Sequence, residues 1–220
     1  MKILFIGNSY TFYNDLPKLF QVLSTQNGHS VEYREVLCGG RHLYDYLDRP
    51  DEYKSKLDSI LEAETFDYAI LQDHSVGAMI EPERFHDAVM RMKKKFGDRV
   101  DKIVLYATWG RKEGSNTLAE HGWTRLGMNQ TIAREYRLCA ENNRCAVSPV
   151  GECFADVMER SDAIDLYNPD LTHPSYEGSC LAAIMHFATI FGVLPEKSAS
   201  LNLPDEIVEL FLRVVKQYIA

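Results

Sequence analysis

The chain has 220 residues, of which 45% are hydrophobic and 25% are charged, a composition typical of a globular domain with a substantial core. Its net charge of −8 argues against a nucleic-acid backbone as partner, because that partner requires a basic surface. No run reaches the roughly 18 consecutive apolar residues of a membrane-spanning helix, so we expect no membrane partner.

The five cysteines are scattered and form neither a Cys-x-x-Cys pair nor a spacing typical of metal ligands. This usage is typical of a reducing compartment. The first residues lack the longer apolar run and the small-residue cleavage site of a signal peptide. We therefore expect a cytoplasmic protein, and a secreted form from which a signal has been trimmed stays open.

Predicted strands and helices alternate along the chain. Apolar runs predict strands at residues 2–7, 29–37, 66–72, 102–109 and 145–150. Helical spacing of apolar residues predicts helices at 15–28, 43–64 with a break near Pro50, 82–96, 126–142, 152–160, 175–191 and 205–218. The alternation predicts one α/β domain, residues 1–220, with a mostly parallel five-stranded sheet and helices on both faces.

The first predicted strand stops abruptly at Gly7-Asn8-Ser9. Ligands of open α/β sheets collect at the carboxyl ends of the strands, so a serine placed there is positioned for chemistry. By itself this pattern is also typical of a turn in which Ser9 caps a helix.

Three further polar clusters occur at comparable places. Gly39-Gly40 follows the second strand, Gln72-Asp73-His74-Ser75 follows the third, and the pair Asp170 and His173 precedes the helix at 175–191. Because the carboxyl ends of parallel strands share one edge of the sheet, we expect the clusters after the strands to meet in space. Their joint occurrence, in this order, favours a common site over a set of unrelated turns.

These residues include the parts needed for nucleophilic acyl transfer. That chemistry needs a hydroxyl, a base within about 3 Å of it, a carboxylate that orients the base, and donors for the oxyanion. Ser9 provides the hydroxyl, His173 the base and Asp170 the orienting carboxylate. The backbone N–H groups of Ser9 and Gly40, with a side-chain amide, are candidate oxyanion donors.

The set Gly7-Asn8-Ser9, a glycine after the second strand, a polar block after the third and Asp170-x-x-His173 resembles the SGNH (GDSL-like) hydrolase superfamily. The resemblance extends from residue 3 to about residue 190, with Asn8 where that family usually has Asp. It implies a flavodoxin-like, three-layer α/β/α fold and a serine esterase with Ser9, Asp170 and His173 as its triad and Gly40 at the oxyanion. No metal or other cofactor is implied.

The third block departs from the usual Gly-x-Asn-Asp of that family, whose Asn side chain is an oxyanion donor. This chain has Gln72 at the start of the block, as in carbohydrate O-acetylesterase relatives. We therefore expect Gln72 to be the third oxyanion donor, with another residue of the block 72–75 as the alternative. The expected substrate is a small-molecule or carbohydrate ester with a short acyl group, acetyl first.

Three other interpretations stay open at this point. An acyltransferase would use the same triad, and a flavodoxin-like domain would bind an anion or nucleotide at the Gly7-Asn8-Ser9 turn, although no phosphate-binding glycine motif supports it. A metal site formed by Asp73 and His74 with the Asp170/His173 pair is disfavoured, because it leaves Ser9 without a role. The polar stretch 110–122 is long enough to be a lid or a substrate loop.

Overall fold

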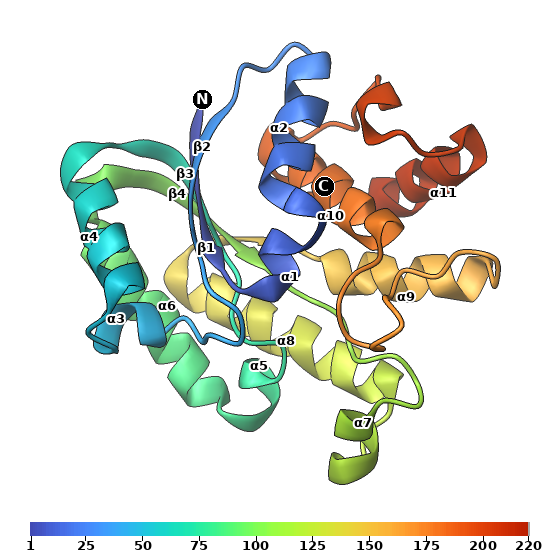
Figure 1. The fold of residues 1–220 in the computed structure, drawn as a ribbon, viewed down its shortest axis with the longest axis horizontal. Coiled ribbons are helices and arrows are strands. Elements are labelled where there is room, and N and C mark those ends of the chain that lie inside the picture. The colour runs from blue at the N-terminus through green and yellow to red at the C-terminus, as the bar shows by residue number, and fades with distance from the viewer. Residues whose placement is uncertain (220) are drawn as a thin grey trace.

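A five-stranded sheet lies between two layers of helices in the computed structural model, which describes residues 1–219 (Figure 1). All pairings are parallel, and the order of strands is β2-β1-β3-β4-β5. The strands are β1 (Lys2–Gly7), β2 (Glu32–Leu37), β3 (Phe66–Leu71), β4 (Val100–Tyr106) and β5 (Ala146–Ser148). The predicted α/β class, the three-layer sandwich and the parallel five-stranded sheet are confirmed.

β1 lies between β2 and β3, so helices cover both of its faces. All four residues from Ile3 to Ile6 have no exposed surface, which is why this strand reads as a continuous apolar run. β2 lies at an edge of the sheet, and its first four residues alternate between exposed and partly buried. The carboxyl end of β1, and the serine that follows it, therefore lie between the carboxyl ends of the neighbouring strands β2 and β3.

Two hydrophobic clusters fill the space on either side of the sheet. One involves α2, α9, α10 and α11, and the other involves α4, α6 and α8 (Figure 1). The helices are α1 (Ser9–Phe12), α2 (Leu16–Gln26), α3 (Asp45–Asp48), α4 (Glu52–Ala63), α5 (Gly77–Ile80), α6 (Pro82–Phe96), α7 (Asn116–His121), α8 (Arg125–Asn143), α9 (Val150–Arg160), α10 (Tyr176–Phe191) and α11 (Asp205–Val215).

α10 positions one half of the candidate site. Its N-cap is Ser175, whose Oγ accepts the Gly178 N–H at 3.1 Å, so the helix begins at Tyr176, three residues after His173. Apart from its two ends, nearly every residue of α10 is buried against α2, α9 and the sheet. In the part of the chain from residue 1 to 219, no helix combines the length and the apolarity that crossing a bilayer requires.

The structure differs from the predicted elements near their ends. α2 covers Leu16–Gln26 rather than residues 15–28, and Asp15 before it adopts a left-handed conformation with φ of +54°. Ser9–Phe12 and Gly77–Ile80 form single helical turns. The stretch 110–122 contains α7, a helix too short to show a periodic apolar pattern in the sequence.

β4 covers Val100–Tyr106 rather than residues 102–109. After Tyr106 the chain turns toward α9, where Trp109 stacks on Phe154 with ring centroids 3.9 Å apart. These buried residues prolong the apolar run in the sequence beyond the last strand pairing.

Candidate active site

The end of β1 delivers Ser9 to the carboxyl edge of the sheet. Asn8 caps α1 through Oδ1, which accepts the Tyr10 N–H at 3.2 Å, and Ser9 is the first residue of that helix. Gly7 is required before this turn, because a Cβ there would lie 2.7 Å from Gln72 Oε1. The close packing under the turn holds Ser9 in one position.

Ser9, His173 and Asp170 form a continuous chain of hydrogen-bonding atoms. Ser9 Oγ lies 2.8 Å from His173 Nε2, and His173 Nδ1 lies 2.6 Å from Asp170 Oδ2. More than 160 residues separate the serine from the other two, so only the fold brings them together. In this order the carboxylate orients the imidazole and the imidazole faces the hydroxyl, as nucleophilic acyl transfer requires.

The loop that carries Asp170 holds its carboxylate in the ionised form. Asp170 Oδ1 accepts the backbone N–H groups of Thr172 and His173, both at 2.9 Å. Partial burial opposes ionisation, but the hydrogen bond with the His173 side chain and these two N–H groups outweigh it and lower the pKa of Asp170. The carboxylate is thus available at neutral pH to orient His173.

Aromatic side chains fix the orientation of His173. Tyr13 stacks on its imidazole, with ring centroids 4.2 Å apart and an interplanar angle of 5°. Trp109 donates from Nε1 to the Thr172 carbonyl at 3.1 Å, and the Asn168 N–H donates to the His173 carbonyl at 2.8 Å. Backbone and ring are therefore both restrained.

Gly40 approaches the same place from the loop after β2. Its φ of +69° is in the left-handed region that glycine tolerates. Asn8 Nδ2 donates to the Arg41 carbonyl at 2.8 Å and so ties this loop to the turn that carries Ser9. Within residues 1–219, the backbone N–H groups of Ser9 and Gly40 have no protein acceptor. Asn8 thus braces the turn with hydrogen bonds from both ends of its side-chain amide.

The structure corrects the expectation for Gln72. Its Oε1 accepts the Asn8 N–H at 2.8 Å and the Thr11 hydroxyl at 3.0 Å, and its Nε2 donates to the Asp73 carbonyl. Because a backbone N–H can only donate, the amide oxygen must face Asn8, and one of the two N–H groups of the amide nitrogen is used by the Asp73 carbonyl. Gln72 is 1% exposed, holds the Ser9 turn from inside the protein and does not line the pocket.

His74, from the same block 72–75, reaches the pocket where Gln72 does not. It lines the pocket beside Ser9, and the Val76 N–H lies 3.5 Å from its Nδ1. Burial, followed by the charge of neighbouring His42, lowers the pKa of His74, so the ring is neutral at pH 7. With Nδ1 as the acceptor, Nε2 carries the proton and is a donor. Sequence spacing cannot reveal which side chain of the block 72–75 faces inward, because the chain leaves the strand there.

The pocket at Ser9 has a volume of about 210 Å³. It is lined by Ser9, Gly40, His74, Ser75, Arg111 and His173, together with three neighbouring residues. This volume is below the roughly 300–1,000 Å³ of sites for drug-sized ligands, so it suits a short acyl group. Ser75 belongs to the polar block 72–75 that the sequence singled out, whereas Arg111 escaped the sequence analysis because it belongs to no recognisable motif.

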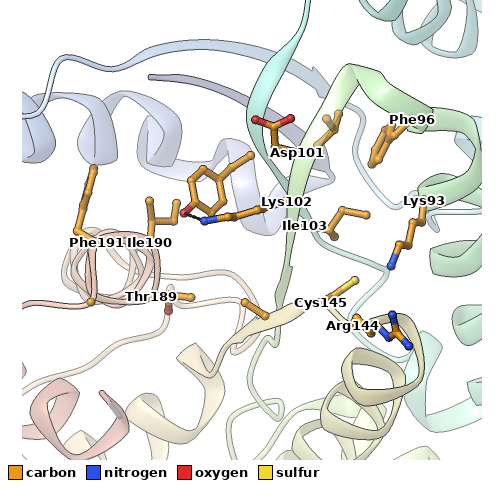
Figure 2. A pocket seen from close by; sticks show the side chains of 15 residues that line it. Lys93, Phe96, Asp101, Lys102, Ile103, Arg144, Cys145, Thr189, Ile190 and Phe191 are labelled. Atoms are coloured by element: carbon orange, nitrogen blue, oxygen red, sulfur yellow. Dashed lines mark hydrogen bonds between the residues drawn. The ribbon is translucent and has the colours of Figure 1, made fainter.

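A larger cavity, of about 770 Å³, lies at the opposite, amino-terminal edge of β4 and β5. Figure 2 shows Lys93, Lys102 and Arg144 around it, with Lys102 directed to the hydroxyl of Tyr68 at 3.5 Å. Neither a serine nor a histidine lines this cavity, so it lacks the parts of the Ser9 pocket.

No family model matches the chain, and no curated protein matches it either. The solved structures do give matches. A protein described as "a putative SGNH hydrolase" from Slackia heliotrinireducens is 27% identical, with a TM-score of 0.75 over 86% of this chain and 98% of its own. The chain has an SGNH-hydrolase-like fold.

Two structures of lower sequence identity share that fold. A DUF4886 family protein from Bacteroides uniformis has a TM-score of 0.79 at 16% identity, over 100% of this chain and 94% of its own. A catalytic mutant of an acetylxylan esterase from Geobacillus stearothermophilus has a TM-score of 0.62 at 14% identity, over 86% and 93%. The resemblance inferred from the sequence is thus confirmed for the fold over most of the chain.

Proposed function

We propose that this protein is a serine esterase that hydrolyses short-chain acyl esters through Ser9, His173 and Asp170. The observation that carries the proposal is the chain of contacts from Ser9 Oγ to His173 Nε2, at 2.8 Å, and from His173 Nδ1 to Asp170 Oδ2, at 2.6 Å. The chain opens onto a pocket that also receives Gly40. The SGNH-hydrolase-like fold supports the same conclusion.

The reaction proceeds in two halves. Ser9 Oγ attacks the ester carbonyl carbon while His173 Nε2 takes the hydroxyl proton, and the imidazolium is stabilised by Asp170. His173 then returns the proton to the leaving alkoxide, which departs as the alcohol and leaves an acyl group on Ser9. Water attacks this acyl group, with His173 again as base, and the acid is released.

The tetrahedral oxyanion needs donors that are already in position. The free N–H groups of Ser9 and Gly40 are two of them, and the ring N–H of neutral His74 is the third. Gln72 contributes indirectly, because it holds the Asn8 N–H and so the turn that presents Ser9. Every donor in this set is uncharged before the reaction, so charge is stabilised only as it develops.

The substrate class follows from the pocket. About 210 Å³ accommodates an acetyl or similarly short acyl group beside the reacting carbon, and the longer alcohol part extends toward solvent. One structural neighbour acts on acetylxylan. Acetyl esters, including those of carbohydrates, are therefore the first substrates to assay.

The test combines a substrate series with a single variant. The native protein should hydrolyse 4-nitrophenyl acetate faster than the butyrate and the octanoate, and a serine-directed phosphonate should modify Ser9 and stop turnover. Ser9→Ala should lower kcat by about 10³-fold or more while the protein stays folded. Ser55→Ala, which changes an exposed serine of α4, should retain activity. Full turnover by Ser9→Ala would refute the proposal.

A further inference from the structure

Arg111 is a cation of the Ser9 pocket for which the triad chemistry has no use. It lies beyond the carboxyl end of β4 and lines the pocket together with Ser9 and His173. Its guanidinium carbon is 5.7 Å from the ring centroid of Tyr10, the residue that follows the nucleophile. The charge of Arg111 therefore lies next to Tyr10, in the same pocket as Ser9.

The backbone around Arg111 is fixed to its surroundings on two sides. The Gly110 carbonyl accepts the Tyr167 hydroxyl at 2.6 Å, and the Lys112 N–H donates to the Leu171 carbonyl at 3.0 Å. Gly110 also packs closely on α8, because a Cβ there would lie 2.4 Å from the Arg125 carbonyl oxygen. The position of Arg111 relative to the loop that carries His173 is thus set by the fold.

The guanidinium of Arg111 has little to bind within the protein. Nη2 donates to Ser75 Oγ at 2.7 Å, and Nε is buried without an acceptor. Across residues 1–219 it makes no ion pair. Its chain neighbour Lys112 is paired with Asp165, and the other arginine near the site, Arg41, is paired with Asp51.

A half-buried, unpaired arginine is costly for a protein, because a charge removed from water is normally compensated by a partner. The nearby carboxylate of Asp170 is already engaged by His173 and two backbone N–H groups. The planar guanidinium is suited to binding a carboxylate through two parallel hydrogen bonds. Arg111 is therefore available to bind a carboxylate from outside the protein.

We infer that Arg111 binds a carboxylate of the substrate, so that the preferred ester carries a negative charge in its acid or alcohol part. The inference rests on the proposed esterase function and narrows its substrate class. A neutral acetyl ester fills the pocket beside Ser9 but leaves Arg111 unpaired. An ester with a carboxylate near the scissile bond engages both.

The experiment uses two matched pairs of esters. Mono-4-nitrophenyl succinate is compared with the 4-nitrophenyl ester of succinamic acid, and 3-acetoxybenzoate is compared with 3-acetoxybenzamide. The first pair places the carboxylate on the acid side and the second on the alcohol side. We expect the native protein to prefer the carboxylate in at least one pair, and 0.5 M salt to weaken that preference.

Variants of Arg111 should remove the preference. Arg111→Gln should raise KM for the preferred anionic ester by roughly 10- to 100-fold, the effect of losing a charged hydrogen bond, with a much smaller effect on its neutral amide. Arg111→Lys should restore part of the preference, because it keeps the charge. Lys112→Gln, which removes the neighbouring cation and its pair with Asp165, should keep the preference.

Two results would overturn the inference. One is the absence of a preference in both pairs for the native protein, a result that does not depend on whether Arg111→Gln folds. The other is an equal loss of kcat for both members of a pair in Arg111→Gln, which would assign Arg111 to the oxyanion instead. If neutral esters are hydrolysed through Ser9 without a charge preference, the esterase proposal survives and only this inference fails. If no ester is hydrolysed and phosphonate leaves Ser9 unmodified, both fail.

Discussion

The two edges of the sheet differ in what the backbone offers. At the carboxyl edge α1 and α10 begin, and a pocket of about 210 Å³ is lined by Ser9 and Gly40, whose N–H groups have no acceptor within residues 1–219. At the amino edge α6, α8 and α10 end around a cavity of about 770 Å³ (Figures 1 and 2). The smaller cavity is therefore the one with donors for a developing negative charge.

Cations at the two edges differ in the same way. At the amino edge Lys93 donates to the Asn143 carbonyl at the end of α8, so its charge offsets the negative end of a helix. At the carboxyl edge Arg111 donates to Ser75 Oγ and, within residues 1–219, makes no ion pair. Cavity size alone therefore does not mark the candidate site, which is distinguished by the contacts among Ser9, His173 and Asp170.

The largest effect that would sharpen this contrast is expected from His74. His74→Ala should lower kcat by about 10²- to 10³-fold with a small change in KM, because an oxyanion donor acts in the transition state. His74→Asn, which restores an N–H donor, should recover part of the loss. Steady-state kinetics with 4-nitrophenyl acetate measures both. His121→Ala, an exposed histidine of α7, is the matched control, and a loss of equal size there would remove the case for His74.

A smaller effect is expected from Asn8→Asp, which keeps the acceptor for the Tyr10 N–H but removes the donor to the Arg41 carbonyl. Two oxygens would then face each other in a site that is 2% exposed. We expect a loss of about 1–3 kcal/mol in the free energy of unfolding and a reduced kcat, since Gly40 is then less firmly held. Urea unfolding and kinetics at the same pH test this. Unchanged stability would show that the bond between the loops contributes nothing.

His186, in the core between the two edges, should make the stability of the protein depend on pH without taking part in catalysis. His186 on α10 has no exposed surface, its Nδ1 lies 2.8 Å from Ser148 Oγ, and burial lowers its pKa to about 3. An unfolded histidine titrates near pH 6.5, so between those values the unfolded chain binds one more proton. Stability should therefore fall as the pH falls below 6.5, by up to about 1.4 kcal/mol per unit.

Replacing this histidine isolates its share of the pH dependence. His186→Gln should flatten the fall in stability relative to the native protein in urea unfolding at pH 7, 6 and 5. The comparison cancels the carboxylates, which titrate alike in both proteins. Parallel curves would mean that His186 is protonated in the folded core.

The smallest effect is expected at the amino edge. Lys102→Gln and Arg144→Gln change cations that line the larger cavity, at the edge of the sheet opposite to the one that carries Ser9. Turnover of 4-nitrophenyl acetate should change by less than about 2-fold, since surface substitutions of this kind rarely exceed 0.5 kcal/mol. A loss of 10-fold or more in kcat/KM would break the contrast between the edges and link the larger cavity to catalysis.

Elements with strong local signals could be predicted from the sequence. α6 begins at Pro82 and ends at Phe96 as expected, because proline suits a first turn and the lysines before Phe96 suit a last one. β1 was recognisable because a strand buried on both faces is apolar throughout. α1, α5 and α7 were not, since four to six residues are too few to show helical periodicity.

For the candidate site, the local sequence predicted which types of residue gather there but not which way their side chains point. The Asp170-x-x-His173 spacing places an acceptor where the histidine N–H groups need one, so their mutual contact follows from a short loop. For Gln72 the outcome depended on Asn8 and Thr11, which both donate to its amide oxygen from the segment that follows β1. Arg111 was invisible as a pocket residue because its setting depends on α8 and the loop before α10.

The sequence by itself determined the α/β alternation, the serine at the end of β1 and the Asp170/His173 pair, because these depend on burial and on contacts a few residues apart. Only the tertiary structure decided that His74 and not Gln72 faces the pocket, and that Arg111 stands there unpaired. Those features depend on which donors and acceptors the fold brings together from segments that are distant in the sequence. The Asn8 N–H in the turn after β1 binds the amide oxygen of Gln72, and His74 lines the pocket beside Ser9.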